Sequence, residues 1–144
     1  MRYLLSLSVL VLFSCSSMKK QTKSGSATGD VLAGTAWTIS SIPDFELEQT
    51  RKPVTISFET ATGRVFGNAG CNSFGGHYTL KGSALKMEKV ISTKMACMPG
   101  MQTENKVMLI LNNTDHFSIS GDKLQLMQGD KVLAEYSRGK KDEK

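Results

Sequence analysis

Residues 54–66, VTISFETATGRVF, decide the class of fold. Val54, Ile56 and Phe58 alternate with polar residues, which is the period-two pattern of a strand that buries one face. Gly63 then lies in a short turn, and a second apolar run follows it. The stretch therefore predicts a β-hairpin.

Similar short apolar runs, separated mostly by turns that contain glycine, occur on both sides of this hairpin. They span residues 37–42, 77–80, 85–91, 117–119, 124–127 and 132–136. With the hairpin they make eight short strands, which indicates a mainly β (α+β) domain. We expect a compact curved antiparallel sheet or a cracked β-barrel.

One segment has helical spacing instead. Val107, Ile110 and Leu111 lie on one side of a helix predicted over residues 101–112, and this helix is expected to pack on the sheet. Glu104 is interpreted as a first-turn charge that the helix dipole favours. The stretch 43–53 is charged and has few apolar residues, so it is expected to be a solvent-exposed loop.

The length and the charge distribution limit the function. A chain of 144 residues fits one ordinary domain and leaves little room for a second. The net charge is +5, yet residues 30–137 carry 10 basic and 11 acidic residues, a balance of −1. Since the basic excess lies in the two ends, we expect no nucleic-acid partner.

The N-terminus has the layout of a targeting segment. Arg2 precedes an apolar run that ends at Phe13 and is too short to span a membrane. The sequence Leu12-Phe13-Ser14-Cys15 resembles the bacterial lipobox, with Phe13 bulkier than usual. This predicts a lipoprotein signal peptide over residues 1–14 and a lipid anchor on Cys15, with a plain secretory signal as the alternative.

The lipid would be followed by a flexible tether over residues 15–29, which is rich in Ser, Gly, Thr and Lys. Residues 139–144 are expected to form a charged disordered tail. Ser16 rather than Asp follows the cysteine, and by its resemblance to enterobacterial lipoproteins this points to the outer membrane, facing the periplasm.

The glycine-rich stretch 67–76 is interpreted as a tight chain reversal. Its glycines allow positive φ or close backbone approach, and Asn68 and Asn72 can bridge turn amides. A phosphate-binding loop is disfavoured, because neither a Lys-Ser/Thr pair nor a helix follows.

Three motifs in order resemble the META domain family, which includes HslJ-like bacterial lipoproteins. They are Gly34-Thr35-Ala36-Trp37, Gly70-Cys71-Asn72-Ser73-Phe74-Gly75-Gly76-His77-Tyr78 and Thr93-Lys94-Met95-Ala96-Cys97. The resemblance implies a META domain over residues 30–138, with one helix, no established catalytic activity and an association with stress and envelope resistance. The motif residues taken as structural are Trp37, Gly70, Asn72, Phe74, Gly76, Tyr78, Thr93 and Met95.

Cys71 and Cys97 are the two cysteines of the folded part. In an oxidising periplasm they are candidates for a disulfide, and the alternative is a pair of buried free thiols. Met95, Cys97, Met98 and Met101 also place four sulfur atoms in seven residues, a set suited to Cu(I). Methionines that fill gaps in a core are the alternative to this metal site.

No catalytic motif accompanies the two histidines, His77 and His116. A Cys71–His77 nucleophile would be abolished by a disulfide. We therefore expect a protein that is not an enzyme and carries no cofactor.

The expected function is that of a monomeric, membrane-anchored binding or structural module in envelope stress, heat or antibiotic resistance. An envelope protein or a small hydrophobic ligand would be its partner. A pilot-like chaperone of a secretion or outer-membrane component and a Cu(I)-binding envelope protein are the alternatives.

Overall fold

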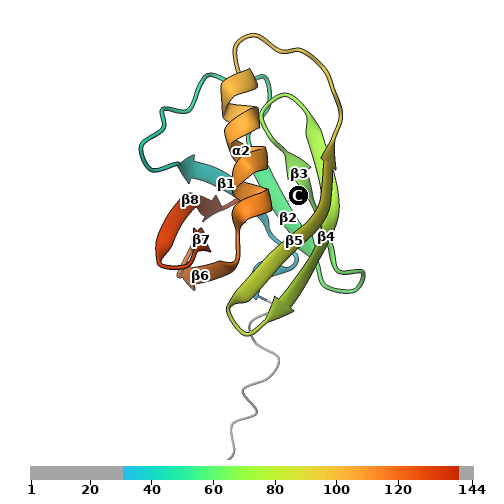
Figure 1. The fold of residues 1–144 in the computed structure, drawn as a ribbon, viewed down its shortest axis with the longest axis vertical. Coiled ribbons are helices and arrows are strands. Elements are labelled where there is room, and N and C mark those ends of the chain that lie inside the picture. Colours follow the sequence, from blue (N-terminus) through green and yellow to red (C-terminus); the bar gives the residue numbers. More distant parts are fainter. Residues whose placement is uncertain (1–30, 140–144) are drawn as a thin grey trace, which may run out of the picture.

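Eight antiparallel strands form one curved, ring-like sheet in the computed structural model, which describes residues 31–139 (Figure 1). The strands are β1 Ala36–Ser41, β2 Thr55–Glu59, β3 Arg64–Asn68, β4 Ser73–Lys81, β5 Ala84–Ser92, β6 His116–Ser120, β7 Lys123–Gln128 and β8 Lys131–Arg138. A single long helix, α2 Met101–Asn113, lies between β5 and β6 in the chain. The expected mainly β fold is confirmed. The predicted signal peptide, the predicted lipidation site Cys15 and the predicted tether lie outside the described residues.

Neighbours in the sequence are neighbours in the sheet, and β1 completes the ring by pairing with both β2 and β8. The predicted hairpin is present as β2 and β3, with Ile56 opposite Gly67 and Phe58 opposite Val65. Gly63 provides its turn with a φ of 63°. The period-two pattern therefore predicted the pairing unit as well as the strand.

The ring is thin at one seam, between β5 and β6. Only Ala84 and His116 pair across it. Two backbone hydrogen bonds accompany that pair, from Leu85 N to Asp115 O at 2.9 Å and from Phe117 N to Ser83 O at 3.0 Å. The other strand pairs of the ring have three to seven paired positions each.

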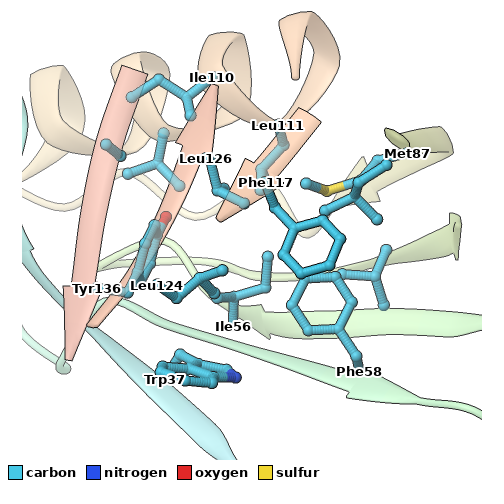
Figure 2. Packing of buried hydrophobic residues seen from close by; sticks show 14 of the residues in the cluster. Trp37, Ile56, Phe58, Met87, Ile110, Leu111, Phe117, Leu124, Leu126 and Tyr136 are labelled. Atoms are coloured by element: carbon cyan, nitrogen blue, oxygen red, sulfur yellow. The ribbon is translucent and has the colours of Figure 1, made fainter. Parts of the chain in front are cut away.

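Apolar side chains fill the interior of the ring (Figure 2). Trp37 and Tyr136 are the largest of those that are fully buried. Helix α2 adds Val107, Ile110 and Leu111, so the predicted helix and its apolar side are confirmed. Burial raises the pKa of the Tyr136 phenol, whose oxygen has no hydrogen-bond partner among the described residues.

The stretch 43–53 differs from the expected solvent loop. Phe45 and Leu47 are half-buried and pack against the core, and Glu48 contacts the start of α2. That expectation was wrong because two apolar residues among several charges are enough to hold the loop on the domain. Residues 140–144 of the predicted tail lie outside the described residues, and Gly139 N donates to Ala36 O at 2.8 Å.

The described part of the chain contains no helix with the length and apolar character needed to cross a membrane.

Candidate functional site

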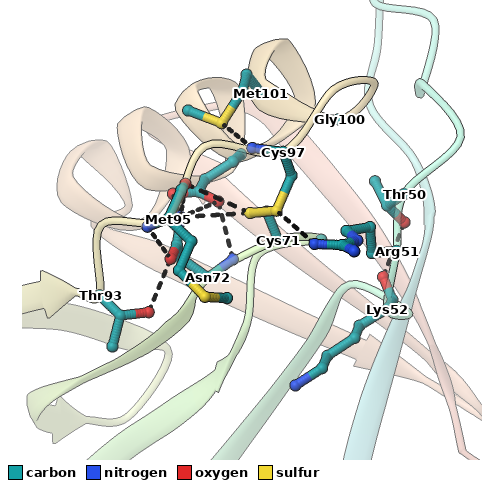
Figure 3. Close-up of a disulfide and its surroundings, with 12 residues drawn as sticks. Thr50, Arg51, Lys52, Cys71, Asn72, Thr93, Met95, Cys97, Gly100 and Met101 are labelled. Atoms are coloured by element: carbon teal, nitrogen blue, oxygen red, sulfur yellow. Dashed lines mark hydrogen bonds between the residues drawn. A yellow bond between two sulfur atoms is a disulfide. The ribbon is translucent and has the colours of Figure 1, made fainter.

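A disulfide joins Cys71, in the turn between β3 and β4, to Cys97, in the segment that leads into α2 (Figure 3). The two Cα atoms are 5.9 Å apart, and each cysteine is 2% exposed. Of the two alternatives drawn from the sequence, the structure has the disulfide rather than the free thiols. The bond holds the start of the helix against the β3–β4 turn.

Asn72 is the centre of a buried hydrogen-bond network beside this disulfide. Its side-chain amide donates to Met95 O at 2.9 Å and to the Glu104 carboxylate at 2.9 and 3.0 Å. Its side-chain oxygen accepts from the Thr93 hydroxyl and from Met95 N, both at 2.8 Å. The amide thus joins the β3–β4 turn, the segment after β5 and α2.

Glu104 belongs to this network, which the sequence interpretation missed. Its carboxylate also accepts the backbone N–H of Asn72 at 2.9 Å, and the residue is only 5% exposed. The interpretation of Glu104 as a first-turn charge is correct for its position on the helix but gave no sign of its burial. Asn68, by contrast, accepts from Gly70 N at 2.8 Å, which is the expected bridge within the turn.

Other residues of the family motifs contribute to packing and to the backbone path. Phe74 and Tyr78 are buried, and Trp37 donates its indole N–H to Leu32 O at 3.3 Å. Gly70 has a φ of 109°, and a Cβ on it would lie 2.6 Å from the Thr50 methyl carbon. A side chain at that position would therefore be strained and crowded.

A second set of contacts caps α2 from a distance. Its N-cap residue is Gly100, which provides no side chain, and the carboxylate of Glu48 takes over this role. One carboxylate oxygen accepts from Gly100 N at 3.1 Å, Gln102 N at 3.0 Å and Thr103 N at 3.3 Å. In return, Glu48 N donates to the Thr103 hydroxyl at 2.9 Å.

The four sulfur residues considered for Cu(I) lie in one segment but in different chemical states. Cys97 has its sulfur in the disulfide, so it provides no thiolate while the bond is intact. The Met101 sulfur accepts a hydrogen bond from Cys97 N at 3.4 Å. Met95 and Met98 are 54% and 86% exposed. A soft-metal site would therefore have only thioethers in the oxidised protein.

The two histidines lie on different strands, His77 on β4 and His116 on β6. His77 is exposed on β4, and the Cys71 sulfur that a Cys–His nucleophile requires is bridged. His116 is 2.7 Å from the Asp115 carboxylate and, with Gly129 N, lowers the pKa of that carboxylate. Across residues 31–139, no three His, Cys, Asp or Glu residues are grouped so that they could hold a metal ion.

An open groove of about 520 Å³ lies along β3, β4 and β5. Gly75 and Gly76 lie along it, and Arg64, His77 and Lys89 bring basic side chains to it. Sequence reasoning did not predict this groove. It depends on strand register and on an irregularity in the β4–β5 pairing between Gly75 and His77.

Comparisons with known proteins agree with this fold. The family model of the META domain matches residues 30–140. A protein from Burkholderia xenovorans, solved by NMR, is similar over 80% of this chain and 88% of its own, with 26% identity and a TM-score of 0.64. A crystal structure of a DUF4847 family protein from Bacteroides vulgatus is similar over 79% and 99% of the two chains, with 15% identity and a TM-score of 0.56. No curated protein matches the chain.

Proposed function

The chain belongs to the META domain family, and we propose that it acts in the cell envelope as a lipid-anchored, non-catalytic binding module. The observation that carries the proposal is the buried Cys71–Cys97 disulfide. Structural disulfides persist in oxidising compartments and are rare in the cytosol. This favours export, as does the lipobox-like sequence that ends at Cys15.

The proposal of a non-catalytic role rests on what the fold leaves available for chemistry. Side chains fill the interior of the ring, and the sulfur of Cys71 is bridged. What the domain offers is an outer surface with a basic groove along β3, β4 and β5. Contact with another envelope component is the activity that such a surface serves. The role in stress, heat or antibiotic resistance follows from the family resemblance.

Acylation tests the anchor. Cells that produce the full chain are grown with a clickable fatty acid, and the labelled protein is followed through membrane fractionation. We expect the wild type to be labelled and recovered in the outer membrane, and Cys15→Ala to be unlabelled. The double variant Cys71→Ala/Cys97→Ala is the matched control and keeps the label. An unlabelled wild type, or label that persists in Cys15→Ala, would contradict the anchor.

Crosslinking in intact envelopes tests the binding role. We expect a discrete crosslinked partner and, in cells that lack the protein, reduced survival under heat or antibiotic challenge with normal protein secretion. Capture of an outer-membrane secretin, together with loss of a secreted protein, would indicate the pilot-like alternative instead. Turnover of a substrate by the purified chain would overturn the non-catalytic proposal.

A further inference from the structure

The floor of the groove on β3, β4 and β5 contains a glycine that packing does not require. A Cβ on Gly75 would meet only Val65 O, at 3.9 Å, and Gly75 does not have a positive φ. Gly76 differs, because its Cβ would lie 2.9 Å from Glu88 O. Close strand packing therefore explains Gly76, whereas the consequence of Gly75 is an open floor.

Two rows of residues cross the three strands at this floor. In one row Gly75 lies between Phe66 on β3 and Ile91 on β5, which are 42% and 74% exposed. In the next row His77 is opposite Arg64 on β3. The rows are two residues apart along β4, which is about 7 Å. The sheet thus places an apolar row beside a basic one.

The charge of the groove is positive. Its lining residues include Arg64, His77 and Lys89 but no carboxylate. Among the described residues, neither Arg64 nor Lys89 forms an ion pair. Two acids lie next to the basic row by register but do not line the groove. Glu59 on β2 is opposite Arg64, and its carboxylate accepts from the Thr62 hydroxyl. Glu88 is opposite His77, and its carboxylate is 3.7 Å from the Lys86 ammonium. Unpaired cations beside an apolar strip suit an anion that carries a hydrocarbon chain.

Lys89 reaches this surface through strained backbone. Its φ is 52°, in the left-handed region that long side chains rarely adopt. It lies where the β4–β5 register shifts, and both Glu88 and Lys89 are exposed although they are consecutive in a strand. Bulges of this kind re-aim a side chain and are frequent beside binding sites.

We propose that this groove binds an alkyl phosphate, with the phosphate group at Arg64 and Lys89 and the alkyl chain across Gly75 against Ile91. The inference rests on the binding role proposed above and names its ligand class. A free soluble ester and the head-group region of a membrane phospholipid share this chemistry.

The test uses the full chain in phosphatidylcholine nanodiscs, titrated with hexyl phosphate and followed by backbone amide NMR. We expect saturable shifts at Gly75, Gly76 and Ile91 that equal concentrations of inorganic phosphate or hexanol do not produce. If the same shifts appear when phosphatidylglycerol replaces part of the phosphatidylcholine, without hexyl phosphate, the source is a phospholipid. Shifts with hexyl phosphate alone indicate a free ester.

Three variants give the proposal its controls. Arg64→Gln/Lys89→Asn should weaken hexyl phosphate binding by at least about tenfold, because charged hydrogen-bond partners are lost. Gly75→Val should fill the groove, with Gly75→Ala as the smaller substitute if the valine variant does not fold. Lys86→Gln removes an exposed lysine of β5 that does not line this groove, and it should change binding by less than about twofold.

Absence of wild-type shifts at millimolar hexyl phosphate, or wild-type affinity in Arg64→Gln/Lys89→Asn, would overturn the groove assignment. The acylation and crosslinking experiments do not depend on Arg64, Lys89 or Gly75. A negative result in the hexyl phosphate titration would therefore leave the proposed anchored role to be decided by the acylation and crosslinking experiments. A chain that is not acylated would still be expected to bind the soluble ester.

Discussion

At the scale of single residues, the side-chain amide of Asn72 connects three segments of the chain at this junction. A side-chain amide both donates and accepts, so one residue pairs with the Glu104 carboxylate, the Thr93 hydroxyl and both polar backbone groups of Met95. The buried Glu104 carboxylate thus receives its hydrogen bonds from a neutral residue, Asn72, rather than from a buried cation. The asparagine of the Gly-Cys-Asn motif is thus explained by packing and hydrogen bonding alone.

Replacing Asn72 with Ala should lower the free energy of unfolding by about 3 kcal/mol, because several buried polar groups lose their partners at once. Urea denaturation followed by circular dichroism measures the change. Asn68→Ala is the control, since Asn68 is half-exposed, accepts from one backbone N–H and donates to the Ser73 hydroxyl at 3.5 Å. This variant should cost about 1 kcal/mol. Equal losses in the two variants would contradict the role assigned to the network.

Tyr136 gives a prediction of opposite sign. Its hydroxyl is buried in the ring without a protein partner among residues 31–139, and such a group costs free energy in the folded state. Tyr136→Phe keeps the aromatic side chain and its packing but removes the hydroxyl, so it should raise the free energy of unfolding by about 1 kcal/mol. Thermal and urea unfolding of this variant measure the change, and a clear loss of stability would show that the hydroxyl has a partner.

At the scale of elements, α2 begins where two distant segments meet it. Gly100 provides no side-chain cap, and Glu48 from the β1–β2 loop accepts three N–H groups at the start of the helix. Its charge lies at the positive end of the helix dipole. The Thr103 hydroxyl in turn accepts the backbone N–H of Glu48. The pattern is that of a capping box whose two halves are separated in the sequence.

Glu48→Ala should therefore destabilise the protein by about 1–2 kcal/mol, and Glu48→Gln by less, because the amide keeps an acceptor oxygen but loses the charge. Glu46→Ala removes an exposed carboxylate from the same loop and should change stability by less than about 0.5 kcal/mol. The comparison of the three variants in urea separates capping from loop charge. A Glu46→Ala loss as large as that of Glu48→Ala would contradict the cap.

These contacts also show where sequence reasoning stops. The strands and α2 were predictable because each carries its own periodicity, as in Ile56 and Phe58 or Val107 and Leu111. The disulfide pair followed from there being two cysteines in the folded part. Neither the capping role of Glu48 nor the burial of Glu104 was predictable, because their contacts lie 32 to 55 positions away in the sequence. The groove required the strand register and the backbone of Lys89, neither of which a residue pattern specifies.

At the scale of the whole molecule, α2 is held at both ends by different means. The Cys71–Cys97 disulfide and the Glu48 cap fix its start, and its end leads into β6, which pairs with β5 at a single position. The seam is thus the weakest closure of the ring, and the disulfide holds the helix that lies between its two strands in the chain. The disulfide joins the β3–β4 turn to the segment before α2, so it fixes the start of the helix without bridging the seam itself.

Loss of the disulfide should therefore lower the stability of the whole domain. Its cysteines are 26 positions apart, which corresponds to about 3–4 kcal/mol of unfolding free energy in the chain-entropy model. Urea unfolding of the wild type should shift to lower denaturant when a reductant is present, whereas Cys71→Ala/Cys97→Ala should unfold at the same urea concentration with or without it. Because the bond constrains the unfolded chain, the shift should be global, seen equally by the Trp37 fluorescence of β1 and by the far-ultraviolet signal of the sheet. A reductant effect that persists in the double variant would show that the shift does not come from this disulfide. An effect confined to a single probe would show that the disulfide stabilises only its own neighbourhood.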